Sequence, residues 1–337
     1  MIRTAFNRRA LAGALFSSLL ALPAAAPGAT PVPGLVVFGD SLSDSGNTFF
    51  AGQCHHTAGT HNNNVPPGYD LDDLLTPNAA YARGGHHFTN GPTWIEDVAK
   101  ALGSGVNANP AFGSDNPLAT NYAFSGARAH DRDGGTEVCK DLGYQVTAFL
   151  DDFGGTAPSG TLYVIEVGGN DINDATTAAA ILILSGSAPS DAIATVAPGL
   201  VAAAQSVAGR IEQLHAAGAR NFLVLEAPDL GMAPAVLGIP GLSGVATYLS
   251  TFYNTYLDLA LDGEVGLDGI DLQRFSFFTA IHQIAGSFTD ITTPCVMPDV
   301  APFVCANPDG HLFWDAIHPT EAAHALIAEK VEAFLAP

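Results

Sequence analysis

The sequence predicts an α/β fold built on a parallel sheet. From Gly34 onward, short apolar, β-branched runs alternate with longer amphipathic stretches, a pattern typical of βαβ units. Three of these runs, at 35–38, 161–167 and 221–226, end in polar or glycine-rich turns. The chain has 337 residues, of which 47% are hydrophobic, so it can bury roughly three quarters of the surface that its unfolded form exposes. This composition excludes disorder for the bulk of the chain.

The remaining elements follow from the same alternation. We expect a fourth strand at 273–278 and a short strand at 120–123. Amphipathic stretches predict helices at 92–102, 143–152, 190–217, 242–262 and 320–335. The last of these follows Pro319, with Thr320 as the expected N-cap.

Two segments, 51–90 and 287–313, fit no regular element and are rich in proline and polar residues. Long loops of this kind inside an α/β domain are usually functional. No internal repeat or linker is evident, so we expect a single domain over residues 34–335.

The N-terminus has the pattern of a secretory signal peptide over residues 1–26. Three arginines precede an apolar run from Ala10 to Leu22, and Ala24-Ala25-Ala26 follows it. A membrane anchor is the alternative, but the run is shorter than the roughly 20 residues that span a bilayer. No second comparable stretch is evident, so we expect no transmembrane anchor and a secreted or periplasmic protein.

The balance of charge is strongly acidic. The chain carries 12 Lys and Arg against 33 Asp and Glu, a formal net charge of −21. Removing residues 1–26 would take away three arginines and no acid, leaving 9 basic residues and a formal charge of −24. Nucleic acids and anionic membrane surfaces attract proteins through clustered Lys and Arg, so we expect neither as a partner.

Four cysteines remain after the predicted signal peptide: Cys54, Cys139, Cys295 and Cys305. An exported protein favours disulfides, and four cysteines allow three connectivities. We favour Cys295–Cys305, which would close a short loop, and by elimination Cys54–Cys139. The alternative is a zinc site at Cys54-His55-His56 with His61, but this spacing fits none of the usual structural zinc patterns, so we expect no metal.

The first candidate for chemistry is Ser41, which directly follows the strand at 35–38 in Gly39-Asp40-Ser41-Leu42. A serine at this point is exposed at the C-terminal edge of the sheet, and the following backbone N–H groups face the same place. The alternative interpretation is a plain helix N-cap.

The second candidate is the segment Asp315-Ala316-Ile317-His318. Serine is a weak nucleophile at neutral pH and needs a base within hydrogen-bond reach, and that imidazole needs a partner to fix its tautomer. His318 and Asp315 could supply both. Alternatively, they are a solvent-facing aspartate and a capping histidine before a helix.

The third candidate is Asn170 in Gly168-Gly169-Asn170-Asp171, after the strand at 161–167. Its amide N–H₂ could meet an oxyanion, and the glycines leave space for a substrate. The alternative is an ordinary Asn-Asp turn. Ligands of doubly wound sheets bind beyond the carboxyl ends of the strands. Ser41 and Asn170 would meet there if the strands at 35–38 and 161–167 are neighbours.

These motifs occur in the order of the blocks of a known family. Gly39-Asp40-Ser41-Leu42, the segment 121–127, Gly168-Gly169-Asn170-Asp171 and the segment 315–320 resemble the blocks of the GDSL (SGNH) hydrolases. The segment 88–94, Phe-Thr-Asn-Gly-Pro-Thr-Trp, is similar to the secreted bacterial branch with phospholipase, hemolysin and choline-esterase-like members. The resemblance covers about residues 34–335.

The resemblance implies a three-layer α/β/α sandwich with a five-stranded parallel sheet in flavodoxin-like order. It implies Ser41 as nucleophile, His318 as base and Asp315 as the residue that orients His318. The backbone N–H groups of Ser41 and Gly126 and the side chain of Asn170 would form the oxyanion hole, with no cofactor and no metal. Many members of this branch have Gly-Gly where this chain has Ser125-Gly126.

The function that follows is a secreted serine esterase acting on short acyl esters, choline esters or lysophospholipids through an acyl-enzyme on Ser41. We expect a monomer whose partners are small-molecule or lipid esters. The alternatives are a polysaccharide O-acetyl esterase and a lipid acyltransferase. An inactive protein that binds lipid or glycan at the cell surface is an alternative of a different class, but such a protein needs none of Ser41, Asn170, Asp315 and His318.

Overall fold

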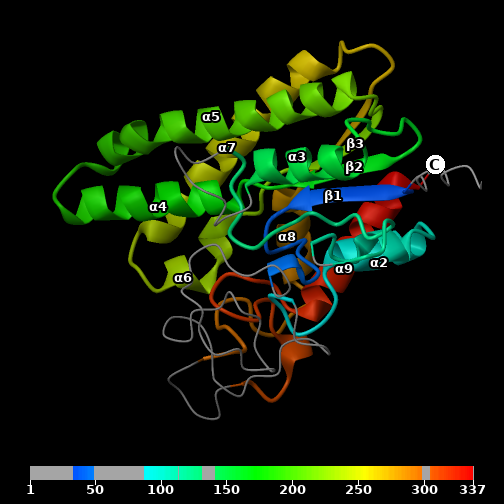
Figure 1. The fold of residues 1–337 in the computed structure, drawn as a ribbon. Coiled ribbons are helices and arrows are strands. Elements are labelled where there is room, and N and C mark those ends of the chain that lie inside the picture. The colour runs from blue at the N-terminus through cyan, green and yellow to red at the C-terminus, as the bar shows by residue number, and fades with distance from the viewer. Residues whose placement is uncertain (1–32, 49–86, 113, 131–140, 298–303, 337) are drawn as a thin grey trace, which may run out of the picture. The chain divides into compact units, whose positions relative to one another are not determined.

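A parallel sheet of four strands forms the centre of the fold (Figure 1). The computed structural model describes residues 33–48, 87–112, 114–130, 141–297 and 304–336. The strands are β1 (Leu35–Gly39), β2 (Leu162–Glu166), β3 (Asn221–Leu225) and β4 (Asp271–Phe275), in the order β1-β2-β3-β4. β1 and β2 are neighbours, with Gly39 opposite Glu166, so the turns that follow them lie at the same edge of the sheet.

The predicted fifth strand at 120–123 is wrong as a regular strand. Val37 of β1 donates its N–H to Thr120 O at 3.0 Å and accepts from Tyr122 N–H at 2.7 Å, which makes one isolated parallel bridge. The ladder stops because the N–H of Thr120, which should reach Leu35 O, donates to Asn107 O at 3.1 Å instead. The Thr120 hydroxyl takes its place on Leu35 O at 2.5 Å. The segment still flanks β1, although the sheet has four strands among the described residues rather than the expected five.

Helices cover both faces of the sheet, as the predicted α/β/α layering requires (Figure 1). The described α-helices are α2 (Trp94–Ala101), α3 (Leu142–Asp152), α4 (Gly169–Leu184), α5 (Pro189–Ala216), α6 (Pro234–Leu237), α7 (Leu242–Glu264), α8 (Phe277–Ala285) and α9 (Glu321–Leu335). Short 3-10 helices lie at Gly105–Ala108, Leu230–Met232 and Pro308–Gly310.

The two helical layers pack against alternate side chains of the strands. Val36 and Phe38 of β1 belong to the core shared with α3, α4, α5 and α7. Leu35 and Val37 belong to the core shared with α2, α8 and α9. Successive residues of a strand point to opposite faces, and these runs are apolar on both, as expected for a sheet covered on both sides.

The five predicted helices correspond to α2, α3, α5, α7 and α9, and Thr320 caps α9 by accepting a hydrogen bond from Ala323 N–H. Two other segments differ from the prediction. The segment after β2 is helical from Gly169, with Gly168 in the left-handed region at a φ of 119°. The predicted strand 273–278 is wrong beyond Phe275, because Ser276 caps α8 by accepting from Thr279 N–H.

Helix α5 is long and contains an 18-residue window of mean hydropathy 1.5, so by length and composition it could span a membrane. This helix is the one that the sequence predicts at 190–217. One face of α5 lies in the core, through Leu200, Val207, Ile211 and Leu214. The predicted signal peptide, the Cys54–Cys139 pair and the alternative zinc site at 54–61 lie outside the described residues.

Candidate active site

Ser41 lies two residues beyond the end of β1, in a tight turn. The N–H of Asp40 donates to Glu166 O at 3.2 Å, which continues the pairing of β1 with β2 for one more residue. The side chain of Asp40 accepts from Leu42 N–H at 3.0 Å and bends the chain back around Ser41. Gln145 of α3 binds Gly39 at both its N–H and its carbonyl, at 2.9 and 2.8 Å. The turn is therefore fixed on both sides of the serine.

The structure brings Ser41, His318 and Asp315 together. His318 Nε2 lies 2.8 Å from Ser41 Oγ, and His318 Nδ1 lies 2.7 Å from Asp315 Oδ2. Asp315 is fully buried, while His318 is 6% exposed and Ser41 9% exposed. Ser41 and His318 are 277 residues apart in the sequence, so the fold alone makes this contact.

The charge of Asp315 decides which atom donates in each of these two hydrogen bonds. Burial by itself would raise the pKa of this carboxyl, but the attraction of His318 and the hydrogen bonds it accepts lower the pKa below its ordinary value. Its Oδ1 accepts from the N–H groups of Ile317 and His318 at 2.9 and 2.8 Å. Asp315 is thus an ionised acceptor, which keeps the His318 proton on Nδ1 and leaves Nε2 to accept from the Ser41 hydroxyl.

A narrow turn presents His318 to the serine. Trp314 N–H donates to His318 O at 2.7 Å, and Phe313 and Pro319 form an antiparallel bridge behind it. The ring of Phe88 packs against the imidazole with 5.5 Å between the ring centroids. The imidazole is therefore held by an aromatic side chain as well as by Asp315.

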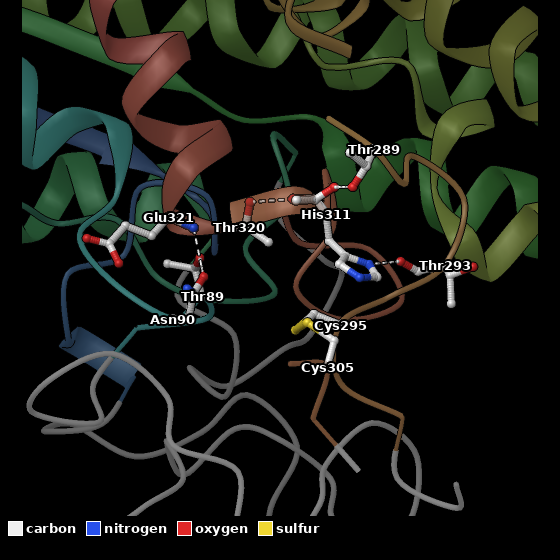
Figure 2. The surroundings of a disulfide bond; sticks show 10 residues. Thr89, Asn90, Thr289, Thr293, Cys295, Cys305, His311, Thr320 and Glu321 are labelled. Atoms are coloured by element: carbon white, nitrogen blue, oxygen red, sulfur yellow. Dashed lines mark hydrogen bonds between the residues drawn. A yellow bond between two sulfur atoms is a disulfide. The ribbon is translucent and has the colours of Figure 1, made fainter. Parts of the chain in front are cut away.

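A disulfide joins Cys295 to Cys305 (Figure 2), which confirms the predicted pair. The N–H of Cys295 donates to Phe313 O at 3.0 Å, and Val296 N–H donates to Trp314 O at 2.7 Å. His311 also belongs to this framework: its Nδ1 contacts Thr293 O at 3.0 Å, and its carbonyl accepts from the Thr320 hydroxyl at 2.8 Å. Cys295 and Val296 thus pair with the residues directly before Asp315.

Gly126 lies in a second turn, beside the first. Phe124 N–H donates to Gly39 O at 3.0 Å, and Ala127 N–H closes the turn onto Phe124 O at 3.0 Å. Gly126 has a φ of 76°, a left-handed conformation that glycine adopts without strain. Asp44, which follows Ser41 by three residues, accepts from Ser125 N–H at 3.0 Å. This contact ties the Gly126 turn to the Ser41 turn.

Asn170 lies in the first turn of α4. Its Nδ2 donates to Ala127 O at 3.0 Å and lies 3.4 Å from Asp40 Oδ2. The side-chain amide therefore sits between the residue that precedes Ser41 and the residue that follows Gly126. Within the part of the chain that the structure describes, no hydrogen bond is formed by the backbone N–H of Ser41 or of Gly126.

Several residues of this region have no role predicted from the sequence. Asp44 and Asn47 look like ordinary residues of a helix start, yet Asn47 donates to Asn121 O and Ala123 O at 2.7 and 2.8 Å. Glu166 is fully buried at the end of β2, and its Oε2 accepts from the Ser43 hydroxyl at 2.8 Å. A glutamate in an otherwise apolar strand was the signal that could have identified it.

Buried carboxyls close to Ser41 have perturbed pKa values. Burial raises the pKa of Asp40 to about 6, although the Leu42 N–H and the charge of His318 act in the opposite direction. Burial also raises the pKa of Glu166 well above its usual value, and the nearby Asp40 adds to the effect. No group of three or more His, Cys, Asp and Glu residues within the described ranges could hold a metal ion.

Comparison with known proteins identifies the family. The model of the GDSL-like lipases/acylhydrolases matches residues 35–331. A phosphatidylcholine-sterol acyltransferase of Aeromonas hydrophila is 24% identical over 349 residues, covering 89% of each chain. The thermolabile hemolysin of Vibrio parahaemolyticus is 24% identical over 320 residues, covering 88% of this chain and 62% of the hemolysin.

Among solved structures, an extracellular lipase from Streptomyces rimosus aligns with 89% of this chain and 100% of its own, with a TM-score of 0.40 and 16% identity. The family match spans both β1, which leads to Ser41, and most of α9, which follows His318. The chain therefore belongs to the GDSL-like lipase/acylhydrolase family and is a carboxylic ester hydrolase.

Proposed function

We propose that this protein is an exported serine esterase that cleaves its substrate through an acyl-enzyme on Ser41. The observation that carries the proposal is the unbroken series of contacts from Asp315 through His318 to Ser41, at 2.7 and 2.8 Å. A buried carboxylate, an imidazole and a serine hydroxyl in this order are the arrangement that activates a serine nucleophile. No metal or organic cofactor is needed for this chemistry.

In the first half of the reaction, Ser41 Oγ attacks the ester carbonyl carbon while His318 Nε2 takes the hydroxyl proton. The carbonyl oxygen becomes an oxyanion, which the N–H groups of Ser41 and Gly126 and the amide of Asn170 stabilise. When this tetrahedral intermediate collapses, the C–O bond of the ester breaks and His318 gives its proton to the departing alcohol. Asp315 stabilises the imidazolium while it exists.

In the second half, His318 takes a proton from water, and the resulting oxygen attacks the acyl carbon of the acyl-enzyme. The same donors hold the second oxyanion. Collapse then releases the carboxylic acid and returns the proton to Ser41. Because the base must be neutral in both halves, we expect activity to fall on acidification, and a rate that did not fall would argue against His318 as the base.

For the substrate, we propose short acyl esters, choline esters or lysophospholipids. A second candidate is transfer of the acyl group to an alcohol instead of water. The name of the Aeromonas relative, a phosphatidylcholine-sterol acyltransferase, favours it, and the match to that relative covers 89% of this chain. Both reactions use the same acyl-enzyme and differ in the acceptor. The arginines and the apolar run at the N-terminus support export, so we expect the working enzyme outside the cytoplasm. We also expect it to be a monomer.

The test is hydrolysis of p-nitrophenyl esters from acetyl to palmitoyl by the chain without residues 1–26. The catalytic variant is Ser41→Ala, and Ser190→Ala, an exposed serine of α5, is the matched control. We expect Ser41→Ala to abolish hydrolysis and Ser190→Ala to leave it unchanged. Retention of full activity by Ser41→Ala would contradict the proposed nucleophile, and an inactive parent protein would favour a lipid- or glycan-binding role.

The acyl-length profile and the acceptor then define the substrate. Activity confined to acetyl and butyryl esters would indicate a short-chain or choline esterase, or a polysaccharide O-acetyl esterase. Activity that rises with chain length would indicate a lipid. Vesicles of phosphatidylcholine and a sterol distinguish hydrolysis from transfer, because hydrolysis releases free fatty acid and transfer produces sterol ester.

A further inference from the structure

Arg128 connects the Gly126 turn to the helix that carries Asn170. Its Nε and Nη2 donate to the two carboxylate oxygens of Asp174 on α4, at 2.9 and 2.8 Å. Its Nη1 donates to the carbonyl oxygen of Gly126. The Arg128 side chain is 12% exposed although its partner Asp174 is 54% exposed. A single, largely buried guanidinium thus binds both structures that hold the proposed oxyanion donors.

We infer that Arg128 is a positioning residue for ester hydrolysis: it sets the separation of the Gly126 N–H from the Asn170 amide by binding the Gly126 carbonyl and Asp174 at the same time. The inference rests on the proposed function, since it concerns the oxyanion hole of that reaction. Arg128 itself does not contact the reacting atoms and acts through Gly126.

The geometry of the guanidinium explains why an arginine suits this place. Its planar fork offers two parallel donors to one carboxylate and further donors on its other edge. Arg128 uses both edges, one for Asp174 and the other for Gly126. A lysine ammonium keeps the charge but is a point donor at the end of a flexible chain. It therefore cannot hold both partners in one fixed plane.

Other hydrogen bonds join the Gly126 turn to α4 at the residues on either side of Arg128. Ala127 O accepts from the Asn170 amide at 3.0 Å, and Ala129 N–H donates to Asp171 at 2.8 Å. These contacts fix the segment after Gly126, whereas the Asp44 contact to Ser125 fixes the segment before it. The Gly126 carbonyl lies between them, and Arg128 binds it.

Oxyanion stabilisation depends steeply on donor position. Donors must lie about 2.7–3.1 Å from the oxyanion of the transition state, and losing one of them costs about 10²–10³-fold in turnover. A displacement of about 1 Å at the reacting centre can cost about 10²-fold. The ground-state ester does not form the oxyanion, so a displaced Gly126 N–H should lower kcat more than it changes KM.

The experiment compares Arg128→Lys and Asp174→Asn with the parent enzyme, using p-nitrophenyl butyrate for kcat and KM. Inhibition by butylboronic acid is measured alongside, because the tetrahedral boronate formed with Ser41 places an oxygen where the oxyanion forms. Arg274→Lys is the matched control, since Arg274 of β4 pairs with Asp258 and Asp262 of α7. Thermal unfolding reports the stability of each variant.

For Arg128→Lys we expect kcat to fall about 10- to 100-fold, KM to change less than about threefold, and the inhibition constant of the boronic acid to rise in parallel with the loss of kcat. Asp174→Asn should shift the same quantities in the same direction by a smaller factor. Arg274→Lys should change none of them. If Arg128 had only a structural role, the loss of kcat would not be accompanied by a parallel loss of affinity for the boronic acid.

An unchanged kcat, or a loss confined to KM, in a folded Arg128→Lys enzyme would overturn the inference while the Ser41-dependent hydrolysis still stood. If Arg128→Lys does not fold, Asp174→Asn decides the matter: a parallel loss of kcat and boronate affinity supports the positioning role, and no change overturns it. A parent protein that neither hydrolyses the ester nor binds the boronic acid would instead refute the proposed function, and the inference with it.

Discussion

The hydroxyl of Ser43 donates to Glu166 Oε2 at 2.8 Å, joining the turn of Ser41 to the last residue of the neighbouring strand β2. Trp94 of α2 donates its Nε1–H to the same hydroxyl at 3.2 Å. The other carboxyl oxygen of Glu166, Oε1, is buried and has no hydrogen-bond partner among the described residues. Asp40 in the same turn is also buried. Two buried carboxyls therefore lie close to each other, and ionising both would place two like charges together at a high cost in free energy.

Replacing Glu166 by Gln should therefore reduce the dependence of stability on pH. The pKa of Glu166 in the folded protein is raised, chiefly by burial and next by Asp40. Between the unfolded and the folded pKa the native state binds more protons, so stability is full below the unfolded value and falls as pH rises through the folded one. Glu166→Gln removes this loss. We expect the unfolding temperature of Glu166→Gln, measured relative to that of the parent, to increase as pH rises from about 5 to 9.

The control for this measurement is Glu329→Gln, at an exposed position of α9. Its unfolding temperature should follow that of the parent at each pH. Identical pH profiles for Glu166→Gln and the parent would show that folding does not raise the pKa of Glu166.

Replacing Asp315 by Asn should lower kcat by about 10³–10⁴-fold at neutral pH. An asparagine keeps the volume of the side chain but can present its N–H₂ to His318 Nδ1, which favours the tautomer whose Nε2 carries the proton and cannot accept from Ser41. Steady-state kinetics measure the loss. Asp309→Asn, at an exposed position in the same segment, is the control. Near-normal turnover by Asp315→Asn would remove Asp315 from the proposed triad.

The meeting of Ser41, Asp315 and His318 was predicted from the base that a serine nucleophile needs and from the resemblance of their motifs to the blocks of the GDSL (SGNH) hydrolases. The sequence did not predict α4, since Gly168-Gly169-Asn170 has the composition of a turn; here a left-handed glycine leads directly into the helix. The predicted strand at 273–278 extended too far for a related reason. Phe277 and Phe278 favour strands, but Ser276 caps a helix that begins with them.

The contacts that support the site could not be predicted in the same way. Glu166 and Ser43 are 123 residues apart, and Arg128 and Asp174 are 46 apart. A single sequence contains no record of which polar side chains the fold will pair over such distances. An isolated Glu in a strand or Arg in a loop shows only that a partner is needed.

Removing the Cys295–Cys305 disulfide should lower both stability and turnover. The bond joins residues 10 apart, and closing a loop of this size typically stabilises a protein by about 2–3 kcal/mol. The Cys295→Ala/Cys305→Ala variant should unfold more easily and should also lose kcat, because this segment donates two hydrogen bonds to Phe313 and Trp314. The double variant is preferable to a reductant, which would also act on any bond between Cys54 and Cys139. Unchanged kcat would show that the turn of His318 holds its shape unaided.

Gly168 connects β2 to α4, which carries Asn170, and its substitution tests whether this connection needs a glycine. Its φ is 119°, and a Cβ at this position would collide with the ring and hydroxyl of Tyr253. That hydroxyl donates to Val167 O at 3.0 Å, and Tyr253 is fully buried. Gly168→Ala should therefore lower the free energy of unfolding by about 3 kcal/mol, as left-handed strain and overpacking combine. It should also lower kcat, because Asn170 follows by two residues.

Gly186→Ala is the matched control for this substitution. Gly186 has a φ of 100°, but a Cβ there would have no atom within 4 Å. This variant bears the backbone strain without the collision, so it should lose about 1–2 kcal/mol and keep its kcat. Urea unfolding and ester kinetics on both variants separate the two effects. If Gly168→Ala lost no more stability than Gly186→Ala and remained fully active, Tyr253 would yield to the new methyl group, and the start of α4 would not need a glycine to place Asn170.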